Sequence, residues 1–199
     1  MIVSRSRNFV FAHIPKTGGI SIAAALAPFA DGQAAAHGDT THETLPDFLA
    51  RHPAMEGHFK FAFVRNPWAR AVSFYFHARQ RLAPTFPQMQ LVERFEDMLR
   101  LMDSGMNWLA DLLSLRPQLD FLRAEGGATL VDFVGRFEQL DRDFAAACAR
   151  TGIEAALPKR NVSQHRPYAS YYSDWGKGFI AERYAQDIRA FDYSFEAAS

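Results

Sequence analysis

A short run of polar residues and glycines between two apolar segments is the first place in this sequence where side chains could do chemistry. Its lysine carries a positive charge, its threonine and serine carry hydroxyl donors, and its paired glycines let a ligand approach the backbone. The residues before it, 9–14, are apolar except for position 13 and typical of a buried strand, and residues 20–26 after it are good helix formers. A strand, a glycine turn and a helix present backbone N–H groups to an anion, so we expect a phosphate or sulfate site. The run consists of Pro15, Lys16, Thr17, Gly18, Gly19, Ile20 and Ser21.

This run differs from the Walker A loop of ordinary ATPases. That motif reads Gly-x-x-x-x-Gly-Lys-Ser/Thr, with the lysine after the glycines, whereas Lys16 precedes Gly18 and Gly19. No aspartate is evident at the position after a strand where a kinase would bind Mg²⁺, so a sugar or nucleoside kinase is disfavoured. A tight turn that carries a solvated lysine is the simpler structural alternative.

A second segment places an arginine at the end of another predicted strand. Residues 59–64 are mostly apolar, Arg65 follows them, and Pro67 suits the start of a helix that continues to Arg79. Open α/β sheets bind ligands at the carboxyl ends of their strands, where Arg65 stands. Ser73 comes eight positions later, and we expect the arginine and the serine hydroxyl to meet around one phosphate. Arg70 on the same helix can be a solvated charge.

These two segments resemble the nucleotide-binding segments of sulfotransferases. The run from Pro15 to Ser21 is similar to the loop that holds the 5′-phosphosulfate of 3′-phosphoadenosine-5′-phosphosulfate, and VRNPWARAVSFY is similar to the segment that holds its 3′-phosphate. From Phe9 to Tyr193 the chain resembles the sulfotransferase family 2 group, which includes carbohydrate sulfotransferases. The resemblance implies an α/β fold of the P-loop NTPase-like type, a three-layer α/β/α arrangement with a central parallel sheet and a helix-rich insertion in the middle.

The resemblance also implies roles for individual residues. Lys16 and the amides of the following residues would hold the phosphosulfate, while Arg65 and Ser73 would hold the 3′-phosphate. The basic segment 157–172 is similar to a loop that closes over the nucleotide, with Asn161 and Ser163 as preferred contacts. Ile20 stands where the family usually has Thr or Ser, so one hydroxyl contact to the 5′-phosphate is expected to be missing.

The reaction also needs a general base for the acceptor hydroxyl. Related uronosyl 2-O-sulfotransferases use a histidine ahead of the second strand, and His42, before Arg65 in the sequence, fits that placement. A neutral histidine, with a pKa near about 6.5, can accept a proton near neutral pH. His58 and Glu43 are the alternatives.

The expected activity is therefore sulfuryl transfer to a hydroxylated acceptor, which family analogy alone makes a saccharide. A degenerate member that binds the nucleotide without catalysis stays open as an alternative. The oligomeric state cannot be predicted from the sequence. Seven histidines occur, but no His-Glu-x-x-His or comparable ligand spacing does, so no metal is expected.

Length and composition indicate a single domain over residues 1–199 with a substantial core. The formal net charge is zero, which argues against broad nucleic-acid binding. No apolar run reaches about 18 residues, so no integral membrane segment is expected. The one cysteine, Cys148, lies in an apolar helical pattern and fits a reducing compartment, so a cytoplasmic location is predicted.

The remaining elements must position these residues. We expect a short helix capped by Thr44 that ends near His52, helices over residues 89–103 and 108–115, and a third strand over residues 128–137. A helix over residues 138–150 closed by Gly152 and a last amphipathic helix over residues 174–191 complete the chain. Gln118 and Asp120 in the middle segment could bind an acceptor, but surface or capping roles are favoured.

Overall fold

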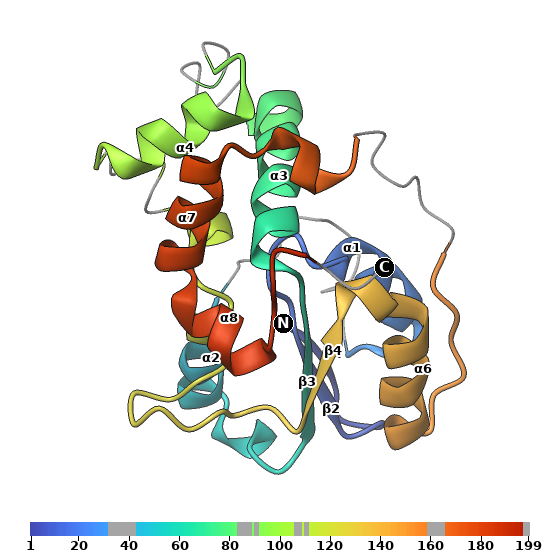
Figure 1. Cartoon of the computed structure of the whole chain (residues 1–199). Helices are drawn as coiled ribbons and strands as arrows, with labels where there is room; N and C mark the ends of the chain where they lie inside the picture. The colour runs from blue at the N-terminus through green and yellow to red at the C-terminus, as the bar shows by residue number, and fades with distance from the viewer. Residues whose placement is uncertain are drawn as a thin grey trace. The chain divides into compact units, whose positions relative to one another are not determined.

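The computed structural model describes residues 1–31, 43–82, 89, 92–105, 109, 112–158 and 166–196. Its residues group into two compact units (Figure 1). The first unit comprises Met1–Arg65 and Gln118–Arg160, and the second comprises Asn66–Pro117 and Asn161–Ser199. The prediction of one domain over the whole chain stays a prediction, and the two units are described separately.

The first unit contains a four-stranded sheet in the order β1-β2-β3-β4. Strands β2, β3 and β4 are parallel, as predicted, but β1 pairs with β2 in the antiparallel direction, so the sheet is mixed. Only residues 5–8 separate β1 from β2, and so short a connection permits an antiparallel pair but not a parallel one. The strands are β1 (Ile2–Ser4), β2 (Phe9–Ala12), β3 (Phe59–Val64) and β4 (Phe133–Arg136).

Aromatic side chains on one face of this sheet form the core of the first unit. Phe9, Phe11, Phe61 and Phe63 alternate along β2 and β3, and all four are buried. Helices α1 (Gly19–Leu26) and α6 (Leu140–Thr151) contribute apolar side chains to the same cluster, including Cys148 of α6. The core position predicted for Cys148 is confirmed, and its burial raises the pKa of the thiol.

The helix boundaries of the first unit follow the predicted caps. Helix α2 (Leu45–Arg51) begins after Thr44, whose hydroxyl accepts a hydrogen bond from the Asp47 N–H at 3.3 Å. Helix α6 ends at Gly152, which adopts a left-handed conformation with φ of 63°. The third strand is shorter than predicted: of residues 128–137, only Phe133–Arg136 pair as β4.

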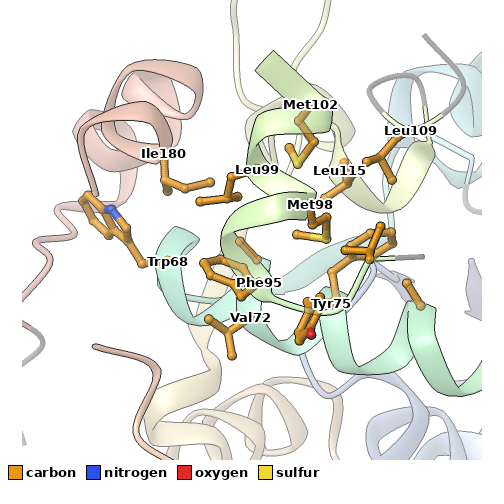
Figure 2. Packing of buried hydrophobic residues seen from close by; sticks show 14 of the residues in the cluster. Trp68, Val72, Tyr75, Phe95, Met98, Leu99, Met102, Leu109, Leu115 and Ile180 are labelled. Carbon is orange, nitrogen blue, oxygen red and sulfur yellow. The ribbon is translucent and has the colours of Figure 1, made fainter. Parts of the chain in front are cut away.

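The second unit is helical and has a core of its own. Helices α3 (Pro67–His77), α4 (Phe95–Asp103), α7 (Asp174–Arg183) and α8 (Ala185–Phe191) form it, from two segments far apart in the sequence. Figure 2 shows Val72, Phe95, Leu99 and Ile180 among the side chains that pack together in this core. Helix α4 starts later than the predicted 89–103, and the described part of 108–115 includes a 3₁₀ turn at Leu113–Leu115.

One prediction for the second unit is wrong, and one alternative left open by the sequence is excluded. The last helix is not continuous, because Tyr184 separates α7 from α8 with φ of −111° and ψ of 27°. The Tyr184 side chain is buried, and its hydroxyl donates to the Leu115 carbonyl at 2.8 Å. Arg70 is not a solvated charge, since it is 3% exposed and donates to the carbonyls of Ser114 and Arg116, at 2.9 Å each.

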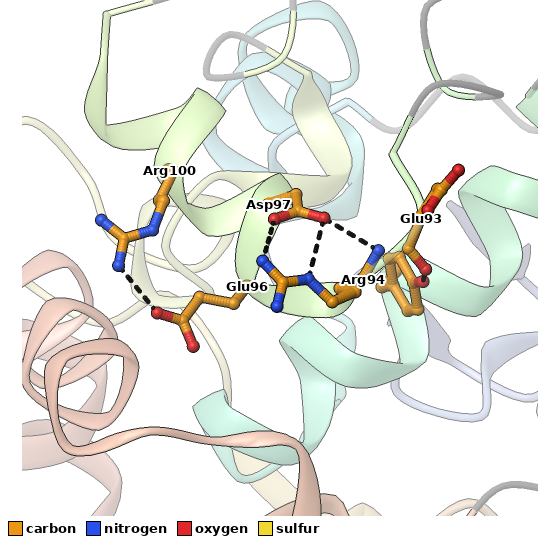
Figure 3. Close-up of polar contacts among 6 residues, drawn as sticks. Glu93, Arg94, Glu96, Asp97 and Arg100 are labelled. Atoms are coloured by element: carbon orange, nitrogen blue, oxygen red, sulfur yellow. Dashed lines mark hydrogen bonds and ion pairs between the residues drawn. The ribbon is translucent and has the colours of Figure 1, made fainter.

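Charged side chains organise the start of α4 (Figure 3). The Asp97 carboxylate accepts from the Arg94 backbone N–H and from its guanidinium, both at 3.1 Å. The hydrogen bond from the Arg94 side chain holds the pKa of Asp97 below its ordinary value. Glu96 and Arg100 form an ion pair one turn apart at 2.9 Å. These pairs are exposed, so they define the helix start more than they stabilise the fold.

Short helical turns join the larger elements: η1 (Ala27–Phe29), η3 (Pro53–Met55), η4 (Ala78–Leu82, a π-helix), η6 (Leu113–Leu115), η7 (Leu119–Phe121), η8 (Phe137–Gln139) and η9 (Tyr168–Tyr171). A bilayer-spanning helix needs about 20 apolar residues, and no helix in the described ranges has the length and hydropathy to span one.

Candidate functional site

The turn between β2 and α1 is built from backbone conformations that few residues adopt. Lys16 has φ of 70° and Gly18 has φ of 85°, both in the left-handed region. The Thr17 side chain is fully buried, and its hydroxyl donates to the Ile14 carbonyl at 2.9 Å. That hydroxyl bond braces the turn, and Thr17 as a whole residue is 0% exposed.

The first turn of α1 has the features of an anion site. Gly18 is the N-cap and offers no side chain to the first N–H groups. Within α1, which is described throughout, the first turn contains no acidic residue. Ser21 lies in this turn, and Ile20 is 53% exposed, which is unusual for an isoleucine. The turn therefore presents backbone donors beside one exposed apolar side chain.

His13 explains why Gly19 has to be a glycine. A Cβ atom added to Gly19 would lie 2.0 Å from two atoms of the His13 ring. The His13 ring stacks on Phe11, with the ring centroids 6.0 Å apart. His13 is therefore wedged between the end of β2 and the start of α1, and it was not among the predicted site residues.

Two cations meet at the carboxyl ends of β2 and β3. The Arg65 guanidinium donates to the Lys16 carbonyl at 3.4 Å and lies 4.1 Å from the centre of the Phe137 ring. Burial, and then the charge of Arg65, lower the pKa of Lys16 to about 8. Among the described residues, no carboxylate forms an ion pair with the Lys16 ammonium. The fold thus concentrates positive charge here, which an anionic ligand would neutralise.

Gln118 has a different role from the predicted surface or capping one. Its side chain is fully buried, its Oε1 accepts from the Arg65 backbone N–H at 2.8 Å, and its Nε2 donates to the Arg65 carbonyl at 2.9 Å. Asp120 pairs with Arg123 at 3.0 Å. A lone polar residue between Pro117 and Leu119 gives no sequence signal of such a contact.

The predicted base candidates occupy different places. His42 lies outside the described residues. His58 immediately precedes β3, whereas Arg65 follows it. His58 therefore lies at the amino end of the parallel strands, and Lys16 and Arg65 lie at their carboxyl end. Glu43 forms an ion pair with Arg51. The placements of His58 and Glu43 give neither of them support as the base.

The other predicted contacts are not assembled around Arg65 by the described structure. Ser73 lies half-buried on α3 in the second unit, so its partnership with Arg65 stays a prediction. Asn161 and Ser163 lie outside the described residues. Among those described, no group of three His, Cys, Asp or Glu side chains is placed to hold a metal ion.

The fold and site define a mixed α/β protein with a cationic glycine turn after its second strand. A family model described as the sulfotransferase family matches residues 1–194, so the chain belongs to that family and the resemblance is confirmed. Membership indicates sulfotransferase activity. An uncharacterized protein of Archaeoglobus fulgidus is 30% identical over 105 residues, which cover 53% of this chain and 77% of that protein. No solved structure matches the chain.

Proposed function

We propose that this protein transfers a sulfuryl group from 3′-phosphoadenosine-5′-phosphosulfate to a hydroxyl group, with a saccharide as the favoured acceptor. The observation that carries the proposal is the pair of cations, Lys16 and Arg65, at the ends of two adjacent parallel strands. The glycine turn and the start of α1 lie beside them. Open parallel sheets bind phosphorylated nucleotides at this edge, as P-loop-like folds do, and the donor carries phosphates for both cations.

In the reaction, the acceptor oxygen bonds to sulfur, the bond from sulfur to the bridging oxygen of the 5′-phosphate breaks, and the hydroxyl proton passes to a base. Protonated Lys16 would donate to the bridging oxygen as negative charge develops there. With a pKa of about 8, Lys16 is mostly charged at neutral pH. His42 keeps its predicted role as the base.

The remaining binding roles follow from the sequence. The backbone of residues 15–21 would cradle the 5′-phosphosulfate, and Arg65 would hold the 3′-phosphate through its planar fork. Ser73, Asn161 and Ser163 keep their predicted roles at the nucleotide. The family match spans segments of both units, which supports one sulfotransferase domain. A cytoplasmic location rests on the single cysteine.

The test is calorimetric titration with 3′-phosphoadenosine-5′-phosphate, with ADP and ATP as controls. We expect binding to the first nucleotide alone, and Arg65→Ala should weaken it by about 1.5–3 kcal/mol, the range for a charged hydrogen bond. Arg150→Ala is a matched control, because the Arg150 guanidinium also stacks on a phenylalanine, 4.9 Å from the Phe59 ring at the other end of β3. A preference for ATP would overturn the proposed donor.

Activity is tested separately by following release of 3′-phosphoadenosine-5′-phosphate in the presence of saccharide acceptors. Lys16→Ala should abolish turnover while largely sparing nucleotide binding, because the lysine acts on the bridging oxygen. Nucleotide binding by the wild-type protein without turnover on any acceptor would favour a degenerate binding protein instead.

A further inference from the structure

Two hydrogen bonds join the Gln118 side chain to the backbone of Arg65. Its amide accepts from the Arg65 N–H at 2.8 Å and donates to the Arg65 carbonyl at 2.9 Å. Arg65 is the first residue after β3, where the ladder to β4 ends at the pair Val64–Arg136. The glutamine side chain therefore supplies the two hydrogen bonds that another strand residue would have made. Its side chain is fully buried, so both bonds are shielded from water.

At the far end of the Arg65 side chain, the guanidinium packs on the ring of Phe137. The Arg65 Cζ lies 4.1 Å from the centre of that ring, and Phe137 is the first residue after β4. A Cβ on Gly18 would lie 3.2 Å from the same ring, so Phe137 also packs against the glycine turn. The ring links the arginine of one strand to the turn that follows another.

This arrangement has an electrostatic cost that explains why Arg65 must be held. Burial is the larger cause of the lowered pKa of Lys16, and the charge of Arg65 adds to it, which means that the two cations repel each other in the ligand-free protein. A long arginine side chain on a free backbone would move toward solvent and lower that repulsion. Fixing its backbone keeps the guanidinium beside Lys16 before an anion arrives, so binding does not have to order it.

We propose that Gln118 is a positioning residue of the anion site, which fixes the backbone of Arg65 so that its guanidinium stays on Phe137 beside Lys16. The inference rests on the proposed function, in which Arg65 binds a nucleotide phosphate. Gln118 itself does not contact the nucleotide. Its effect on binding must therefore pass through Arg65.

The first experiment is a double-mutant cycle with 3′-phosphoadenosine-5′-phosphate as the calorimetric ligand. Gln118→Met keeps the side-chain length but removes both hydrogen bonds, and we expect about tenfold weaker binding, as for a buried polar group left unpaired. In the Arg65→Ala background the same substitution should have no further effect. Equal losses in both backgrounds would overturn the proposal.

Two further variants keep the cycle interpretable. Phe144→Leu alters a buried core residue of α6 and should lower stability without changing the nucleotide affinity. Phe137→Leu removes the ring but leaves the Gln118 amide in place, and it should weaken binding more when Arg65 is present than in the Arg65→Ala background, where only its packing on the glycine turn is lost. If Gln118→Met does not fold, the Phe137→Leu cycle decides whether holding Arg65 matters, and independence from Arg65 would count against the proposal.

A ligand-free measurement separates this inference from the proposed function. The lysines are few, namely Lys16, Lys60, Lys159 and Lys177, so the Lys16 side chain can be followed by NMR and assigned with Lys16→Arg. Arg65→Ala should raise the pKa of Lys16, and Gln118→Met should move it in the same direction. If the wild-type protein binds no nucleotide, the proposed function fails while this titration still tests the positioning. A folded Gln118→Met protein with unchanged Lys16 titration would refute the inference.

Discussion

At the scale of single residues, the site depends on groups held in unfavourable states. Lys16 is a non-glycine residue with φ of 70°, and burial and then the charge of Arg65 lower the pKa of its ammonium. Such strain and repulsion persist only where the surrounding structure enforces them. Here the enforcing groups are the buried Thr17 hydroxyl, which bonds to Ile14, and the Gln118 amide, which bonds to Arg65.

The lowered pKa of Lys16 predicts a pH dependence of turnover. Below pH about 8 the free protein carries the ammonium, and above it the neutral amine predominates. In the proposed reaction the charged form donates to the bridging oxygen, so kcat/KM should fall about tenfold per unit above pH about 8. Initial rates of 3′-phosphoadenosine-5′-phosphate release between pH 7 and 9.5 measure this. The activity of Lys16→Arg, which stays charged, should show no such fall, and an identical fall in that variant would exclude Lys16 as the cause.

The contact between His13 and Gly19 predicts the effect of a single methyl group. Gly19→Ala places a Cβ 2.0 Å from the His13 ring, so either the ring or the helix start must move. We expect a loss of about 1–3 kcal/mol in the free energy of unfolding, typical of overpacking, measured with urea. His13→Ala in the same chain should restore most of it. A double variant no more stable than Gly19→Ala would show that the ring is not the obstacle.

At the scale of elements, α3 shows how one side chain defines a helix start. The side-chain oxygen Oδ1 of Asn66 accepts from the N–H groups of Trp68 and Ala69, at 3.0 and 3.3 Å. Its side-chain Nδ2 donates to the Ser194 carbonyl at 2.8 Å. Pro67 occupies the first helical position, where its missing N–H costs nothing. The same side chain thus caps α3 and anchors the C-terminal segment of the second unit.

Removing this cap should weaken the second unit measurably. Asn66→Ala loses the cap and the bond to Ser194, so the free energy of unfolding should fall by at least about 1 kcal/mol. Asn66→Asp keeps the accepting oxygens and loses only the donor, so it should cost less. Urea unfolding followed by tryptophan fluorescence compares them, and equal losses would mean that the cap contributes little.

At the scale of the whole molecule, the chain passes between the two units three times, after Arg65, Pro117 and Arg160. Each unit is therefore made of segments that are separated in sequence. If one unit unfolds, its segment that joins the two segments of the other unit becomes a long flexible loop. Closing such a loop costs entropy. We expect the units to unfold together for this reason.

A cavity in one core tests this coupling. Leu99→Ala in the second unit should lower the free energy of unfolding by about 2–5 kcal/mol, as for other buried leucines. Trp68 and Trp175 report on the second unit by fluorescence, and the buried thiol of Cys148 reports on the first through its labelling rate. Both signals should shift to the same lower urea midpoint. Separate midpoints would mean that the units unfold independently.

Local sequence patterns determined the elements around the turn. The apolar run at residues 9–14, the glycine pair and the helix formers at 20–26 gave β2, the turn and α1, and Thr44 and Gly152 marked helix ends correctly. The same motifs indicated the sulfotransferase family, which the match over residues 1–194 confirms. These signals are local because backbone conformation and capping depend on neighbours within a few residues.

Tertiary structure alone decided which distant residues meet. Gln118 lies 53 positions from Arg65, and no local pattern distinguishes a glutamine that clamps a backbone from one on the surface. The sequence left a solvated Arg70 open for the same reason, since its carbonyl partners come from residues 114 and 116. The break at Tyr184 and the joining of two separated segments into one helical unit likewise follow from packing. Burial of side chains is a property of the folded chain, whereas sequence periodicity records only which residues can be buried.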